Sequence, residues 1–144
     1  MKVFYDAIAG LVPEQATAHL ITADLSDPPV ASDYPYVVVW GSAPTAYSGD
    51  GPDEPTAGDR PDAVLLDVRL TIAALSLTQL DLAVSGVHAA LNRVVPVVSG
   101  YRCNRIRLVS LLPAQPDRDL YIGGVNPIYT VEEFTLRATK ETSP

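Results

Sequence analysis

The sequence is poor in cysteine, in long apolar runs and in basic residues. Its single cysteine, Cys103, excludes an internal disulfide and a cysteine-based metal cage. No apolar run reaches the roughly 18 residues that a membrane-spanning helix requires, so we expect no membrane contact. Ten Lys and Arg stand against 17 Asp and Glu, which gives a formal net charge of −7. This balance argues against general nucleic-acid binding.

The sequence also lacks the signatures of common catalytic sites. It contains no G-x-S-x-G, no H-E-x-x-H and no phosphate-binding P-loop. We interpret its two histidines, His19 and His88, as surface or partly buried side chains. Nearby arginines favour a thiolate at Cys103, but the sequence pairs no histidine with it, so we interpret it as an ordinary structural thiol. We therefore predict that the chain is not an enzyme and takes no cofactor.

Hydrophobic periodicity predicts an α+β fold in a single domain of all 144 residues. Residues 2–12 carry an apolar stripe at helical spacing. Ser76 and Gln79 predict a capping box that begins a second helix, and this helix ends at Asn92 and Arg93. Four strands are predicted from β-branched runs or period-two alternation: 36–40, 64–74, 104–112 and 127–139. The order α-β-β-α-β-β then gives a four-stranded, mainly antiparallel sheet with two helices on one face.

Some segments carry finer signals. Residues 64–74 alternate so that one face of the strand is fully apolar. In 127–139, Thr130 and Glu132 interrupt the inward face, and we predict a β-bulge there. Residues 14–25 fit either a helical turn or a short strand.

A long polar loop, residues 41–63, separates the first two predicted strands. It holds four prolines, four glycines and five acids against one arginine, with no Val, Leu, Ile, Phe or Met. Its acids lack the spacing of a calcium-binding loop, so we predict no metal site. We expect a flexible insertion that becomes ordered on a partner, with an insertion of no function as the alternative. The candidate partner-binding residues are Tyr47, as the aromatic anchor, with Asp50, Asp53, Glu54, Asp59 and Arg60.

The second face of the predicted sheet mixes apolar residues with charged ones. Such a face is neither a solvated surface nor a dry core, and it is typical of a protein interface. For Arg105 and Arg107 we weigh a phosphate-binding face against ion pairs with Asp67 or Glu133 of a neighbouring subunit, and we favour the ion pairs. The candidate residues for an oligomer or lumen face are Asp67, Arg69, Arg105, Arg107, Tyr129, Glu133 and Arg137.

Several motifs together carry a resemblance to a known family. They are YPYVVVWGS, the long polar insertion followed by V-x-L-T-I-A, the helix S-L-T-Q-L-D…V-x-A-A-L, GYRCNRIRL, and the closing NPIYTVEEFTLRAT. In these features, which cover most of the chain, the sequence resembles the tail terminator (tail completion) proteins of long-tailed, siphovirus-type bacteriophages.

The resemblance implies a structural protein without enzymatic activity. Its subunits would form a homo-hexameric ring that caps the tail tube, ends its polymerisation and presents a docking surface for the head–tail connector proteins. DNA would pass through the lumen without specific binding, and the protein would belong to the virion tail, assembled in the host cytoplasm. The alternatives are a head–tail connector or neck ring of the same particle, and a small ligand-binding α+β domain.

Overall fold

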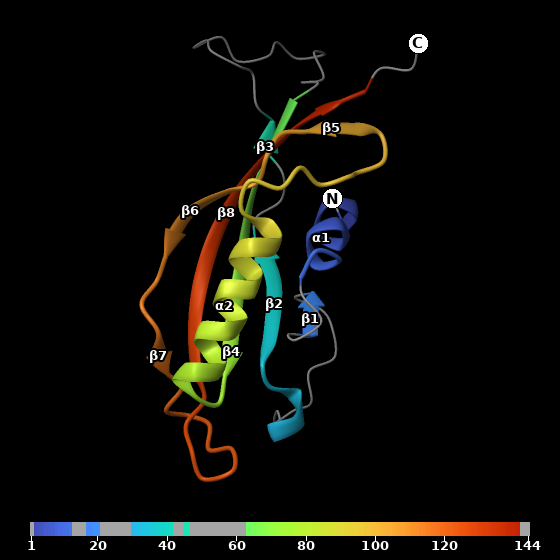
Figure 1. Ribbon diagram of the computed structural model, residues 1–144. Coiled ribbons are helices and arrows are strands. Elements are labelled where there is room, and N and C mark those ends of the chain that lie inside the picture. The colour runs from blue at the N-terminus through green and yellow to red at the C-terminus, as the bar shows by residue number, and fades with distance from the viewer. Residues whose placement is uncertain (1, 13–16, 21–29, 42–44, 47–62, 142–144) are drawn as a thin grey trace.

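The computed structural model describes residues 2–12, 17–20, 30–41, 45–46 and 63–141 of the chain. Its α-helices and strands follow one another in the order α1, β1, β2, β3, β4, α2, β5, β6, β7, β8 (Figure 1), with a single 3-10 turn, Ala31–Asp33, before β2 in the described residues. Their bounds are α1 Lys2–Ala9, β1 Thr17–Leu20, β2 Tyr36–Gly41, β3 Thr45–Ala46, β4 Ala63–Ala74, α2 Leu77–Leu91, β5 Tyr101–Cys103, β6 Arg107–Leu111, β7 Gln115–Pro116 and β8 Ile128–Lys140.

The strands form one sheet, which is antiparallel apart from the parallel pair β1 and β2. Its path is β1-β2-β4-β8-β5; β6 and β7 also pair with β8, and β3 pairs with β4. The α+β class is therefore confirmed. The expected four strands were too few, because the described residues form six strands of three or more residues and two of only two residues. One of the six, β1, resolves the ambiguous segment 14–25 in favour of a strand at Thr17–Leu20.

The predicted strand 104–112 begins later, as β6 at Arg107, and a separate short strand, β5, precedes it, which corrects the expected element order. The first residues of the predicted strand lie outside the sheet and bond with the turn after α2: Arg93 N–H donates to the Ile106 carbonyl at 2.7 Å, and Ile106 N–H donates to the Val94 carbonyl at 2.8 Å. These bonds are tertiary, so the local period-two pattern did not indicate them.

The pair of β4 and β8 forms the long axis of the sheet (Figure 1). Its register runs without interruption from Ala63 opposite Thr139 to Ala74 opposite Ile128. The bulge predicted at Thr130 and Glu132 was therefore wrong. Both side chains stay on the inward face because each finds a polar partner there: Thr130 Oγ1 donates to the Leu112 carbonyl, and Glu132 contacts His88.

The irregularity of register lies instead in β6, between Leu108 and Ser110. A bulge in an edge strand leaves one residue unpaired and bends that strand. The long central strands are unaffected by it.

Both helices pack on one face of the sheet, where the core lies (Figure 1). The predicted start of α2 is confirmed: Ser76 Oγ accepts a hydrogen bond from Gln79 N–H at 3.1 Å. Gln79 Oε1 accepts a hydrogen bond from the N–H of Leu75, whereas a capping box would place this bond on the N–H of Ser76. The helices contribute these buried residues: Phe4, Ile8, Leu80, Ala83, Val87 and Leu91. No helix in the described part of the chain is long and apolar enough to cross a membrane.

Most of the polar loop 41–63 is outside the described residues. Within it, Thr45–Ala46 pairs with Val64 and Leu65 at the start of β4. The expected flexibility of the insertion concerns segments 42–44 and 47–62, which the structure does not describe, and it stays a prediction.

Candidate assembly face and basic cleft

The side of β2, β4 and β8 that points away from the helices is called the outer face below. Its side chains form cross-strand rows, such as Trp40, Arg69 and Glu133, or Val38, Thr71 and Val131. None of these six residues is fully buried, although the inward residues beside them on the same strands are. The outer face is therefore left partly open by the chain itself.

Polar contacts within the subunit order part of this face. Trp40 Nε1 donates to Thr71 Oγ1 at 2.9 Å, and the Arg69 guanidinium carbon lies 5.2 Å from the centre of the Trp40 ring. This distance fits a cation–π contact. Thr135 Oγ1 donates to Asp67 Oδ1 at 3.3 Å. The charged residues on the outer face thus sit in a defined arrangement before any partner binds.

Most of the predicted oligomer residues lie on this face, as the alternation indicated. Asp67, Arg69, Tyr129, Glu133 and Arg137 belong to the outward positions of β4 and β8. Their role in assembly stays a prediction.

The two remaining residues of that set occupy the edge of the sheet. Arg107 begins β6 and stands opposite Thr135, whereas Arg105 falls in the break between β5 and β6. The expectation that both arginines lie on one strand is therefore wrong, because the strand begins only after Arg105.

The candidate partner-binding residues of the loop cannot be placed. Tyr47, Asp50, Asp53, Glu54, Asp59 and Arg60 all lie outside the described residues.

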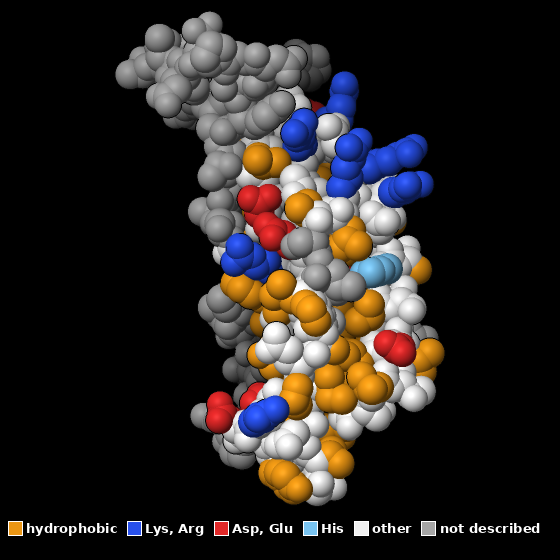
Figure 2. All heavy atoms as spheres, turned by 90° about the vertical axis from the view of Figure 1, so that its left-hand side faces the viewer, with side chains coloured by type: hydrophobic (Ala, Val, Ile, Leu, Met, Phe, Trp, Pro, Cys, Tyr) orange, Lys and Arg blue, Asp and Glu red, His pale blue; other side chains and the backbone are white. Residues whose placement is uncertain are grey.

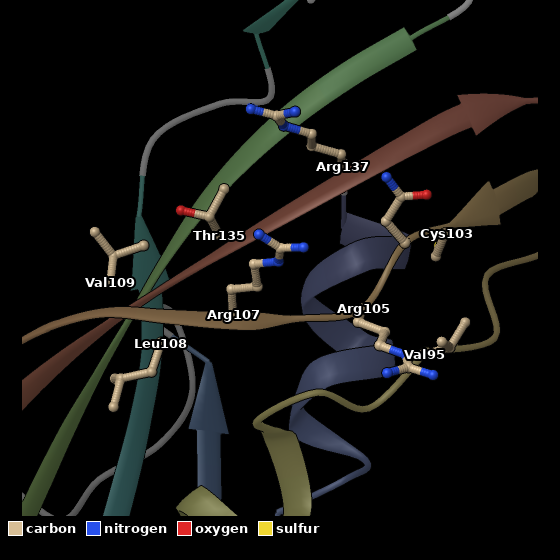
Figure 3. A pocket seen from close by; sticks show the side chains of 9 residues that line it. Val95, Cys103, Arg105, Arg107, Leu108, Val109, Thr135 and Arg137 are labelled. Carbon is tan, nitrogen blue, oxygen red and sulfur yellow. The ribbon is translucent and has the colours of Figure 1, made fainter.

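A cleft of about 770 Å³ lies at this edge (Figure 3). Its polar lining is Asn104, Arg105, Arg107, Thr135 and Arg137, and its apolar lining is Val95, Cys103, Leu108 and Val109. In Figure 3, Arg107 and Arg137 reach out on the same side as Thr135, and Arg105 turns towards Val95. A second hollow shares Arg105 and Arg107 and adds Arg93. A third is lined by Arg102, Thr139, Lys140 and Glu141. We call the three together the basic cleft.

The end of α2 is what brings the arginines together. Arg93 follows the helix in the left-handed backbone conformation, with φ at 66°. This conformation costs a residue other than glycine about 1 kcal/mol. The bonds that join Arg93 and Val94 to Ile106 hold this turn beside Arg105. Asn104 N–H donates to the Arg137 carbonyl at 2.8 Å, which fixes the other side of the break to β8. Sequence spacing missed Arg93 because it lies in another predicted element.

Within the described part of the chain, no carboxylate forms an ion pair with Arg93, Arg105 or Arg107. Figure 2 shows Lys and Arg side chains gathered towards one end of this side of the molecule, with hydrophobic side chains over the middle and the other end. Burial raises the pKa of the Cys103 thiol, which agrees with an ordinary structural thiol. The cleft can therefore bind an anion, but it presents no activated nucleophile.

A second polar site lies inside the subunit and was missed by the sequence interpretation. His88 Nε2 on α2 contacts Glu132 Oε1 on β8, and Glu132 is fully buried with no partner for Oε2. Burial raises the pKa of Glu132, and the charge and hydrogen bond of His88 act in the opposite direction. The only sequence signal was one acid at an inward strand position. No group of three or more metal-ligating side chains occurs among the residues that the structure describes.

Comparisons with known proteins give a match among solved structures. No protein-family model and no curated protein matches the chain. Among solved structures, the chain is similar to one described as "Virion of native gene transfer agent (GTA) particle". The TM-score is 0.56 at 14% sequence identity, over 92% of this chain and 84% of the other. At this identity the match establishes a shared fold.

Proposed function

We propose that the chain is a structural protein of a phage-like virion, in which its copies form a hexameric ring. The ring caps the tail tube, ends its polymerisation and offers a docking surface to the head connector, while DNA passes through its lumen. The fold shared with a chain of a gene transfer agent virion over 92% of this sequence supports a virion role. The resemblance of the motifs to tail terminators supports the position at the end of the tail.

The main support for a ring is the outer face, which the chain itself leaves partly open. Apolar side chains and charges alternate over β4 and β8, and at the edge Val109 is 58% exposed and Leu112 is 52% exposed. Mixed surfaces of this kind are typical of interfaces that form after folding. A ring further requires two different, complementary patches on each subunit. The basic cleft, which borders the outer face and shares Arg137 with it, would be one of these patches.

Light scattering coupled to size-exclusion chromatography tests the ring. We expect the mass of a hexamer at high protein concentration, in exchange with smaller species on dilution. A chain that stays monomeric at every concentration, with or without tail tubes, would contradict the proposal.

Electron microscopy of tagged particles tests the position of the ring. A label at the head-proximal end of isolated tails, together with overlong tails when the protein is absent, is expected for a tail terminator. A label found only on heads, with tails of normal length, would favour the connector ring.

A further inference from the structure

The charges of this chain are separated in the sequence. Six of its ten Lys and Arg line the basic cleft: Arg93, Arg102, Arg105, Arg107, Arg137 and Lys140. The segment from Tyr47 to Asp62 has five acids and one arginine, a net charge of −4 (five negative, one positive). The cleft is predominantly basic, although Glu141 also lines its third hollow, and the segment is predominantly acidic, so each is suited to binding the other.

The two clusters attach to opposite sides of the central strand pair. The acidic segment leaves from Ala46, in the short strand that pairs with β4, and returns at Ala63, at the start of β4. The basic cleft lies on the far side of β8, along β5 and β6. Both are at the same end of the sheet, because Ala63 stands opposite Thr139 in β8, next to Lys140.

This arrangement suits a head-to-tail contact. In a closed ring each subunit uses one surface towards one neighbour and a different surface towards the other. An acidic segment that attaches beside β4 and a basic cleft on the far side of β8 would provide such a pair.

We propose that the basic cleft binds the acidic segment Tyr47–Asp62 of the adjacent copy in the ring. Guanidinium groups bind carboxylates with paired, charge-assisted hydrogen bonds. Arg93, Arg105 and Arg107 are exposed, and no described carboxylate forms an ion pair with them. The inference rests on the proposed ring and names the contact that closes it.

Nucleic-acid phosphates would suit the same arginines. The net charge of −7 disfavours that occupant because a polyanion is repelled by the rest of the chain. The acidic segment needs no further component and is present once for every cleft.

A charge-exchange experiment tests the contact. A cleft variant carries Arg105→Glu and Arg107→Glu, and a segment variant carries Asp53→Lys and Glu54→Lys. We expect each variant alone to fold, by circular dichroism, and to stay monomeric, because its cleft and segment now have the same sign. An equal mixture is expected to form rings in which the two variants alternate. The matched control, Arg118→Glu, changes an exposed arginine of the loop that precedes β8 and should assemble like the wild type.

A peptide measurement identifies the occupant directly. A fluorescent peptide of residues 47–62 is titrated into the segment variant, whose cleft is intact and unoccupied by a neighbour. We expect binding that weakens with salt and falls at least about tenfold with the cleft variant. The same peptide with Asn and Gln in place of its acids is expected not to bind.

The outcomes separate the inference from the proposed function. Rings formed by the cleft variant alone, as readily as by the wild type, would overturn the inference and leave the ring intact. A further chain carries the substitutions of the cleft variant and of the segment variant together. If this chain forms rings but the mixture of the two variants does not, the contact lies within one subunit and the inference is overturned. Binding of a short DNA duplex where the peptide does not bind would also overturn it. A wild type that forms no ring would instead refute the proposed function.

Discussion

Replacing His88 by Ala should destabilise the subunit strongly near neutral pH. The substitution leaves the fully buried Glu132 carboxylate without the ring nitrogen that contacts it, and Oε2 already has no partner. Removing one member of a buried pair costs about 3–5 kcal/mol. The His88 side chain is 32% exposed, so water enters the space that it leaves. We therefore expect the lower end of that range, about 3 kcal/mol.

The sign of the pH dependence follows from the direction of the shift. Burial raises the pKa of Glu132, so the folded state holds the proton more tightly than the unfolded state. The free energy of unfolding then falls as the pH rises from the unfolded pKa, about 4.3, through the folded value. His88 acts against that rise, so His88→Ala raises the pKa of Glu132 further and enlarges the loss at neutral pH. Below the unfolded pKa the carboxyl is neutral in both states and the defect should shrink.

Urea unfolding followed by circular dichroism measures these effects. The design is a double-mutant cycle of His88→Ala and Glu132→Gln at about pH 7.5 and at about pH 4, below the unfolded pKa, with a coupling of about 2 kcal/mol expected at the higher pH. His88→Gln is the matched control because its amide keeps a donor near the carboxylate. An equal cost of His88→Ala at both pH values would show that the charge of Glu132 does not determine the loss. No coupling in the cycle would show that the pair does not contribute to stability.

Three further predictions concern the outer edge, a glycine and a helix cap. Val109→Asp should change the free energy of unfolding by no more than about 0.5 kcal/mol but abolish rings in light scattering. The control Val97→Asp, at a valine that follows α2 and is 92% exposed, should change neither the stability nor the ring. Gly41→Ala should cost about 2 kcal/mol in urea unfolding, because its φ is 154° and the new Cβ would clash with a backbone carbonyl oxygen of β4. The control Gly124→Ala, where φ is 85° and the Cβ would enter open space, should cost less. Equal losses in the two variants would refute the clash. Ser76→Ala should cost about 1 kcal/mol by the same assay, since Ser76 Oγ caps α2, and no loss would mean that the cap is replaced by solvent.

The elements that depend on local chemistry were predicted from the sequence. The alternation over 64–74 gave β4 with its apolar face inward, and Ser76 gave the start of α2. The outward charges of β4 and β8 followed from the same period of two.

The features that depend on distant contacts could not be predicted. The break at 104–106 exists because backbone groups there bond with the end of α2. The partner of Glu132 Oε1 lies 44 residues away on another element. The sequence therefore predicted a bulge where the structure has an inward carboxylate paired with His88. For the same reason Arg93 was not grouped with Arg105 and Arg107, although all three line one hollow.

In the proposed ring, further copies of the chain complete the outer face and edge of this sheet. Native mass spectrometry of the purified protein over a range of concentrations measures this assembly. We expect a hexamer that dissociates with rising salt and is lost in Val109→Asp. A monomer at all concentrations, or a dimer that Val109→Asp leaves unchanged, would contradict it.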